Sequence, residues 1–155
     1  MKNKKCRHLV LILGDQLDEA SSAFEGFDPS QDVVLMIEAL EESTHVWSHK
    51  IRTTLFLSAM RHFADGLKQR GWQVDYRALD AAADKTLAAG LLAAIEIHQP
   101  EAVLGVEPGD LRVRSQLENA IHSGAARAHK TTAAASKHIK STKPCVSCAS
   151  LPNKI

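Results

Sequence analysis

Three segments that carry polar groups suited to ligand binding each follow a short apolar run. The first is Gly14-Asp15-Gln16-Leu17, directly after the apolar run Leu9–Leu13. Asp15 can accept hydrogen bonds, Gln16 can both donate and accept them, and Gly14 allows the backbone to approach a bound molecule closely. The same residues also fit a structural turn in which Asp15 caps the helix that follows.

The second segment is Glu38-Ala39-Leu40-Glu41-Glu42, at the end of the apolar run Asp32–Glu38. Its three carboxylates could accept hydrogen bonds from the imide of a heterocycle or from ribityl hydroxyls. Alternatively, Glu41 and Glu42 are acids in the first turn of the next helix, where the helix dipole favours them. Three further residues of this region fit either a ligand site or ordinary core and helix positions: His45, Trp47 and His49.

The third segment, residues 107–114, follows the apolar run Ala102–Val106. Pro108-Gly109 also fits a plain turn and Asp110 a helix cap. Arg112 and Arg114 flank Val113 and cannot both lie on its buried face, so at least one is exposed and able to meet an anion or a partner domain.

The sequence contains none of the common motifs for nucleotide binding, metal-dependent proteolysis or nucleophilic hydrolysis. It contains no G-x-G-x-x-G, no G-x-x-x-x-G-K-[ST], no H-E-x-x-H and no nucleophile elbow, so we predict no catalytic residue of those classes. Cys145 and Cys148 have the spacing of a metal clasp but supply only two of the roughly four ligands that structural zinc requires. We therefore expect no metal site.

The three segments need a scaffold that brings them together, and the periodicity of the chain predicts one. Four short β-rich runs alternate with helical stretches, which is typical of a parallel sheet covered on both faces. We predict an α/β fold, a Rossmann-like doubly wound parallel sheet of four to five strands, in which all three segments share the carboxyl-end rim. The predicted strands are Arg7–Leu13, Asp32–Glu38, Gln73–Leu79 (near an edge) and Ala102–Val106.

Three helices are expected between and after these strands. The clearest spans His45–Arg70, with an apolar stripe through Ile51, Leu55, Phe56 and Met60. The others are Asp84–His98, capped by Asp84, and Asp110–His122, capped by Asp110 and stopped at Gly124.

Composition limits the class of protein. At 155 residues and 45% hydrophobic content the chain is about one domain, able to bury a core without a metal or disulfide. A formal net charge of +1 argues against strong non-specific attraction to nucleic acid. No apolar run approaches the roughly 20 residues of a membrane helix. With an odd count of 3 cysteines, which fits a reducing compartment, we expect a cytoplasmic protein.

The segment from Ala125 to Ile155 differs from the rest. It lacks apolar periodicity and is rich in Lys, Ser, Thr and Ala. Such a composition buries too little surface to offset the entropy of ordering, so we predict a disordered tail.

Taken together, several motifs resemble one family, the deoxyribodipyrimidine photolyase-related proteins, which include iron–sulfur bacterial cryptochromes and (6-4) photolyases. The motifs that carry the resemblance are Leu9–Leu17, Glu38-x-x-Glu41-Glu42, His49-Lys50 with Ser58–Leu67, and Glu107–Glu118. The resemblance implies an N-terminal α/β domain, here residues 1–124, that binds an antenna chromophore, 6,7-dimethyl-8-ribityllumazine. The residues it implies for antenna binding are Gly14, Asp15, Gln16, Ile37, Glu38, Leu40, Glu42, His45 and Phe56.

In that family FAD, a 4Fe-4S cluster and DNA are bound by a large helical C-terminal domain, which performs light-driven repair as a lyase. This chain instead continues into the tail of residues 125–155, so we expect no FAD, no cluster and no repair by this chain alone. An out-of-frame tail or a truncated gene would explain the departure. Two other readings stay open, a stand-alone Rossmann-like flavin- or nucleotide-binding module and a non-functional fragment.

Overall fold

The computed structural model describes residues 5–39, 50–79 and 86–128. All four predicted strands are present, as β1 (His8–Leu11), β2 (Val33–Ile37), β3 (Val74–Arg77) and β4 (Ala102–Gly105). η1 (Ser22–Phe24, a 3₁₀ helix), α2 (Lys50–Gln69) and α3 (Leu87–His98) lie between the strands, and α4 (Leu111–Ala128) follows the last one.

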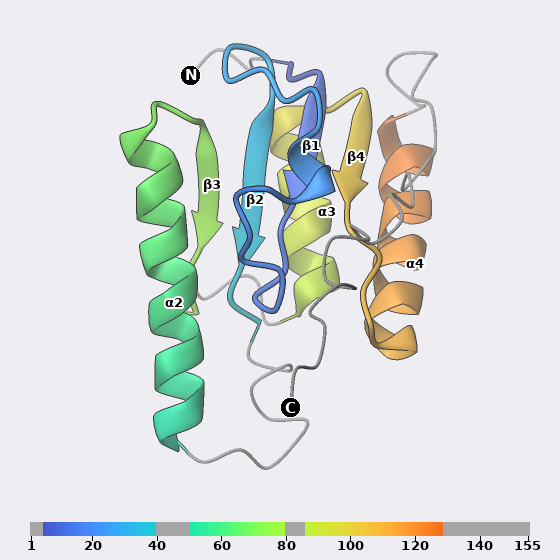
Figure 1. The fold of residues 1–155 in the computed structure, drawn as a ribbon. Helices are drawn as coiled ribbons and strands as arrows, with labels where there is room; N and C mark the ends of the chain where they lie inside the picture. Colours follow the sequence, from blue (N-terminus) through green and yellow to red (C-terminus); the bar gives the residue numbers. More distant parts are fainter. Residues whose placement is uncertain (1–4, 40–49, 80–85, 129–155) are drawn as a thin grey trace, which may run out of the picture.

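The strands form one parallel sheet in the order β3-β2-β1-β4 (Figure 1). β2 is buried along its whole length, as expected of an aliphatic strand inside a parallel sheet. β3 is half-buried and lies at an edge, which confirms the prediction from its alternating sequence. The α/β fold class is thus confirmed.

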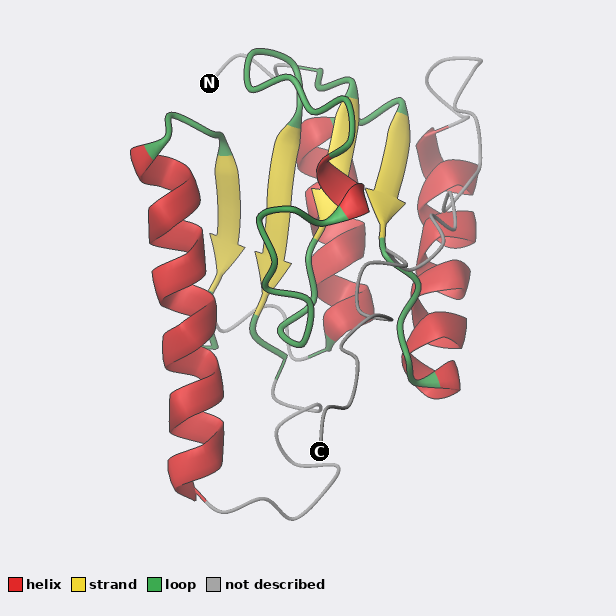
Figure 2. Cartoon of the chain, viewed as in Figure 1, coloured by secondary structure: helices red, strands yellow, loops and turns green. Residues whose placement is uncertain are grey.

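Successive side chains of the strands enter two separate cores, because they point alternately to opposite faces. Val10, Val34 and Met36 pack with η1 and α2. On the other face, Leu9, Leu11, Leu35 and Ile37 pack with α3 and α4. Figure 2 shows these helices on both sides of the sheet. The sheet is therefore doubly wound.

The order of the strands reverses beside β1. The chain runs outward from β1 to β2 and β3, then returns through α3 to place β4 on the other side of β1. The carboxyl ends of β1 and β4 consequently lead into diverging connections. In open α/β sheets this is where ligands bind.

Helix α2 buries less of its apolar stripe than its sequence predicts. Met60, Ala64 and Leu67 are buried, but Ile51 and Leu55 are 70% and 72% exposed. The reason is visible in Figure 1, where α2 continues past the carboxyl ends of the strands. Its first turns have no sheet beneath them.

The start of α3 and the end of α4 differ from the predicted helix ends. The Oγ1 of Thr86 caps α3 by accepting from the Ala89 N–H at 3.1 Å, so Asp84, which lies outside the described residues, is not the cap. α4 does not stop at Gly124 but continues to Ala128. A Cβ at Gly124 would come within 3.2–3.4 Å of Ile95 and Leu92. That glycine serves the close approach of two helices rather than a helix end.

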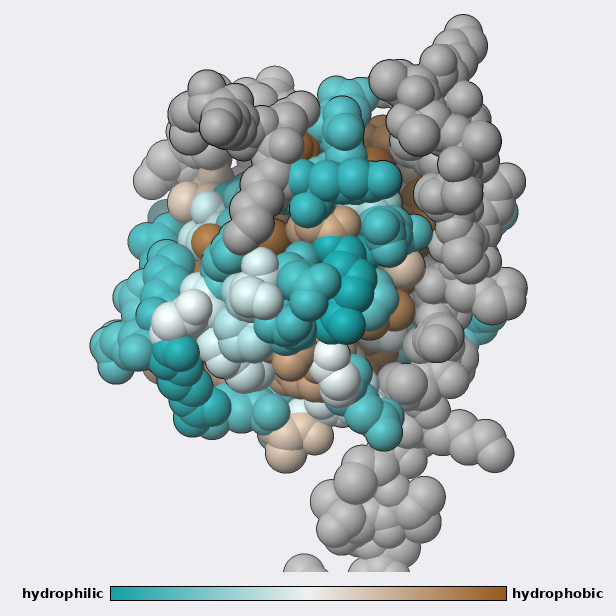
Figure 3. Space-filling model, turned by 90° about the horizontal axis from the view of Figure 1, so that it is seen from above, coloured by the Kyte–Doolittle hydropathy of each residue, from teal (hydrophilic) through white to brown (hydrophobic). Residues whose placement is uncertain are grey.

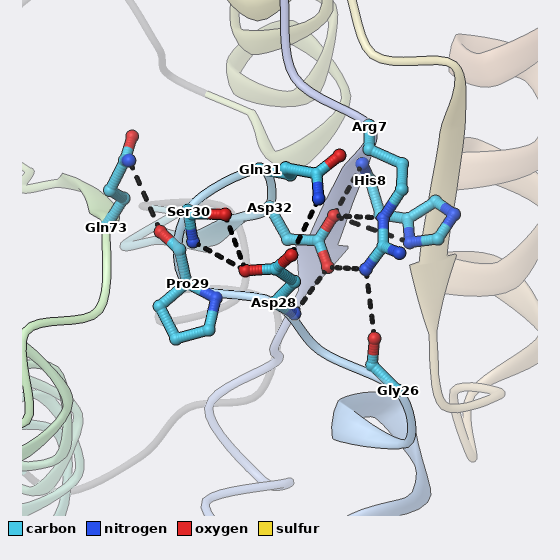
Figure 4. Close-up of polar contacts among 9 residues, drawn as sticks. All are labelled: Arg7, His8, Gly26, Asp28, Pro29, Ser30, Gln31, Asp32 and Gln73. Atoms are coloured by element: carbon cyan, nitrogen blue, oxygen red, sulfur yellow. Dashed lines mark hydrogen bonds and ion pairs between the residues drawn. The ribbon is translucent and has the colours of Figure 1, made fainter.

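The amino ends of the strands are tied together by a buried carboxylate. Asp32, 0% exposed, accepts from Arg7 Nε at 2.9 Å and Arg7 Nη2 at 2.5 Å. It also accepts from the backbone N–H groups of His8 at 3.1 Å and Asp28 at 2.8 Å (Figure 4). Burial alone would raise the pKa of Asp32, but these donors outweigh it and the pKa lies below its ordinary value.

Arg7 also donates to the Gly26 carbonyl at 2.9 Å, which ties the loop before β2 to the start of β1. Viewed from this end, the described surface is mostly hydrophilic (Figure 3). We name Arg7, Asp32 and the loop 26–31 the amino-end cluster.

Candidate ligand-binding site

A cavity of about 380 Å³ lies at the opposite, carboxyl end of the sheet. Its volume falls within the range of roughly 300–1,000 Å³ typical of small-molecule sites. Segments that follow β1, β2 and β4 line it together with α2 and the first turns of α3 and α4. The lining residues are Leu13, Gly14, Asp15, Ile37, Glu38, Ala39, Arg52, Thr53, Phe56, Leu57, Met60, Leu87, Pro108, Gly109, Asp110 and Val113.

The first predicted segment forms a turn beneath this cavity. The Gln16 N–H donates to the Leu13 carbonyl at 3.0 Å, which closes the turn around Gly14 and Asp15. Asp15 caps no helix, because the next described helix is η1, whose cap is Ser21. The structural-turn reading is therefore correct for the backbone, and Asp15 is one of the residues that line the cavity.

Gly14 is needed here because α2 approaches the turn closely. A Cβ on Gly14 would lie 2.5 Å from the Phe56 ring and 2.8 Å from Met60 Sδ. Any larger residue would push those side chains aside. Phe56, predicted as a site residue, is 44% exposed and forms part of the cavity wall.

Gln16 does not line the cavity but links two of the segments around it. Its Nε2 donates to the Val106 carbonyl at 3.4 Å, so the turn after β1 is joined to the segment after β4. Its Oε1 is buried and has no hydrogen-bond partner among the described residues.

Glu38 lines the cavity, and protein groups already occupy its carboxylate. Oε1 accepts from Arg61 Nε at 2.7 Å and from the Tyr76 hydroxyl; Oε2 accepts from Arg61 Nη2 at 2.9 Å and the Leu79 N–H at 3.1 Å. A carboxylate has about four acceptor positions, and all are filled. Contact between Glu38 and a ligand stays a prediction.

These contacts also shift the pKa values of Glu38 and Tyr76. Burial would raise the pKa of Glu38, but the donors from Arg61, Tyr76 and Leu79 outweigh it, and the pKa lies below its ordinary value. Burial and the bond to Glu38 raise the pKa of Tyr76. Arg61 and Tyr76 were not among the site residues predicted from the sequence, although a buried acid at the end of an aliphatic strand requires a cation or donor nearby.

The third segment reaches the cavity through Pro108, Gly109 and Asp110. Asp110 Oδ1 accepts from the Arg112 N–H at 2.7 Å, which confirms its role as the cap of α4. Arg114 is half-exposed and paired with Glu107 and Glu118. Both carboxylates partner Arg114 near the start of α4.

Several predicted residues lie outside the described part of the chain. They are Leu40, Glu41, Glu42, His45, Trp47 and His49 in the second segment, and Cys145 and Cys148 in the tail. Ile37, also predicted, is buried and lines the cavity. Within the described residues no group of three or more His, Cys, Asp or Glu could hold a metal ion, and no described helix is long and apolar enough to cross a membrane.

The chain is thus a doubly wound α/β domain with a mostly apolar cavity where the strand order reverses. The sequence model of the deoxyribodipyrimidine photolyase-related protein family matches residues 10–144. A (6-4) photolyase of Agrobacterium fabrum (strain C58) is 39% identical over 111 residues, covering 71% of this chain and 22% of that relative. The chain belongs to the deoxyribodipyrimidine photolyase-related family. It spans about a fifth of the length of the relative it matches.

Proposed function

We propose that the carboxyl-end cavity binds a planar heterocyclic pigment, 6,7-dimethyl-8-ribityllumazine, and that the domain serves as the antenna-binding part of a photolyase-related DNA repair protein. The observation that carries the proposal is the cavity of about 380 Å³ at the switch point of the sheet. Family membership is consistent with it.

The lining suits a flat ring with a polar chain. Aliphatic and aromatic side chains, among them Ile37, Phe56 and Met60, offer apolar surface to the ring faces. Gly14 lets Phe56 and Met60 pack directly against the backbone of the turn, so that these two side chains form part of the wall. Asp15 and Thr53 supply oxygen atoms that can accept hydrogen bonds from the imide or from ribityl hydroxyls.

In this proposal the protein's own residues bind and orient the pigment and exclude water from it. When bound, the pigment supplies light absorption, and the excitation passes to a flavin held elsewhere. FAD, the 4Fe-4S cluster and DNA belong in this account to a helical domain of the full-length family. Residues 1–124 form the antenna domain in the proposal; that boundary falls inside α4, which ends at Ala128.

Equilibrium titration tests the proposal. The purified chain is added to 6,7-dimethyl-8-ribityllumazine while fluorescence anisotropy is recorded, with riboflavin, FMN and FAD measured in parallel. We expect saturable binding of the lumazine that is tighter than binding of the other three. A preference for FMN or another nucleotide would favour a stand-alone flavin- or nucleotide-binding module. Tight binding of FAD with repair of irradiated DNA by this chain alone would contradict the proposal.

A further inference from the structure

One face of α2 forms a wall of the cavity, and that wall contains an arginine. Arg52, Thr53, Phe56, Leu57 and Met60 all line the cavity. They form two adjacent pairs, 52–53 and 56–57, four positions apart, followed by Met60, which places them on one side of the helix. Arg52 lies in the first turn of α2, whereas Met60, further along the helix, is buried against the sheet.

Arg52 differs from the other arginines with described side chains. Each of the others has a carboxylate within 4.0 Å, in the pairs Arg7–Asp32, Arg61–Glu38, Arg70–Glu19, Arg77–Asp75, Arg112–Asp110 and Arg114–Glu118. Within the described part of the chain, Arg52 makes no hydrogen bond or ion pair, and its side chain is exposed. Its five N–H donors are available to a ligand.

The other charged groups of the lining are less available. The carboxylate of Glu38 is filled by Arg61, Tyr76 and Leu79, and Asp110 caps α4. Arg52 is therefore the one cation that lines the cavity among the described residues, and it has no protein partner there. A guanidinium presents donors in a fixed planar fork that matches carbonyl oxygens on a ring edge.

We propose that Arg52 is a specificity-determining residue that donates hydrogen bonds to the ring carbonyl oxygens of the bound pigment. The inference rests on the proposed function and deepens it. It names the chemical feature that the cavity selects, an electron-rich dione edge on a planar heterocycle. Asp15 supplies acceptors for N–H and O–H groups, and Arg52 supplies the complementary donors.

Binding of 6,7-dimethyl-8-ribityllumazine to Arg52→Met and Arg52→Lys tests the inference. A hydrogen bond that involves a charged group is worth roughly 1.5–3 kcal/mol, so we expect Arg52→Met to bind about 10- to 150-fold more weakly. Arg52→Lys keeps the charge but loses the fork and should bind with intermediate affinity. The absorption maximum of the bound pigment should also move in Arg52→Met, because a cation has been removed from the ring edge.

Lys50→Met is the matched control, since Lys50 begins the same helix, is exposed and does not line the cavity. It should bind the pigment as the wild type does, and all three variants should keep the wild-type circular dichroism. If wild type binds the lumazine and Arg52→Met binds it equally with an unmoved spectrum, the inference is wrong and the proposed function stands. If wild type binds no lumazine, both are wrong.

Discussion

Strand β2 has a buried carboxylate at each end, and only the carboxylate at the carboxyl end lines the cavity. Asp32 precedes the strand and Glu38 follows it, at 0% and 1% exposure, and each accepts two hydrogen bonds from one arginine. At the amino end the loop 26–31 hydrogen-bonds to both members of the Arg7–Asp32 pair. At the carboxyl end the pair stands beside a cavity of about 380 Å³.

The comparison shows that a buried ion pair does not by itself mark a functional site. Both carboxylates are saturated by protein donors, so both hold elements together. The carboxyl end differs because Gly14 lets Phe56 and Met60 of α2 pack against the turn after β1, and because α2 extends beyond the sheet. In the proposed function, ligand binding depends on lining groups that the described protein residues leave unengaged, of which Arg52 and Asp15 are the charged examples.

The largest expected effect is on stability, at the amino end. Arg7→Met removes the partner of a fully buried carboxylate and should lower the free energy of unfolding by about 3 kcal/mol. Urea denaturation measures this, with Arg70→Met as control. Arg70 pairs with Glu19 on the surface, where such pairs contribute roughly 0–1 kcal/mol. Equal losses in the two variants would show that the amino-end cluster adds no special stability.

At the carboxyl end, Arg61→Met should cost less than Arg7→Met. Each carboxylate keeps two other donors, but the Arg61 side chain is 52% exposed against 34% for that of Arg7, and Arg7 also donates to the Gly26 carbonyl. We therefore expect a loss of about 2 kcal/mol for Arg61→Met in urea denaturation. Tyr76→Phe removes one donor and should cost about 1 kcal/mol. If Tyr76→Phe cost more than Arg61→Met, the hydroxyl rather than the guanidinium would be the main partner of Glu38.

A third substitution, Gly14→Ala, tests pigment binding rather than the free energy of unfolding. Gly14→Ala should drive the Phe56 ring and Met60 into the cavity and weaken pigment binding by about tenfold, or about 1.4 kcal/mol. Gly66→Ala, on the same helix α2, is the control because a Cβ there meets nothing within 4 Å. Fluorescence titration should show unchanged binding for Gly66→Ala. Unchanged binding for Gly14→Ala would place the ligand elsewhere.

The smallest effect concerns pH. Folding lowers the pKa of both Asp32 and Glu38, so the stability from each pair is fully present above the ordinary values near pH 4 and is lost as pH falls through the lower folded values. Asp32→Asn and Glu38→Gln should each flatten the fall in unfolding free energy below pH 4. Urea denaturation between pH 7 and pH 2 measures the slope, and a slope unchanged in both variants would contradict the assignment.

The sequence predicted the sheet well because its signals are local. Four aliphatic runs mark the strands, and the alternation in Gln73–Leu79 marked the edge. Gly14, Asp15 and Glu38 were expected on one rim because parallel strands bring their carboxyl ends together, whereas Ile37 and Phe56 were implied only by the family resemblance; all five line the cavity.

What the sequence could not show depends on distant contacts. Arg61 and Tyr76 lie 23 and 38 positions from Glu38, and no local pattern joins them. The helical period alone does not show that α2 extends past the sheet, where Arg52 borders a cavity, or that Arg61 reaches Glu38.

The central claim, that a pigment binds at the carboxyl end, is tested most directly by locating it. Backbone amide chemical shifts of the chain should be compared with and without saturating 6,7-dimethyl-8-ribityllumazine. The account predicts large changes at Gly14, Asp15 and Phe56, with Asp28 and Asp32 unchanged. Changes centred on the amino-end cluster, or none at saturation, would contradict it.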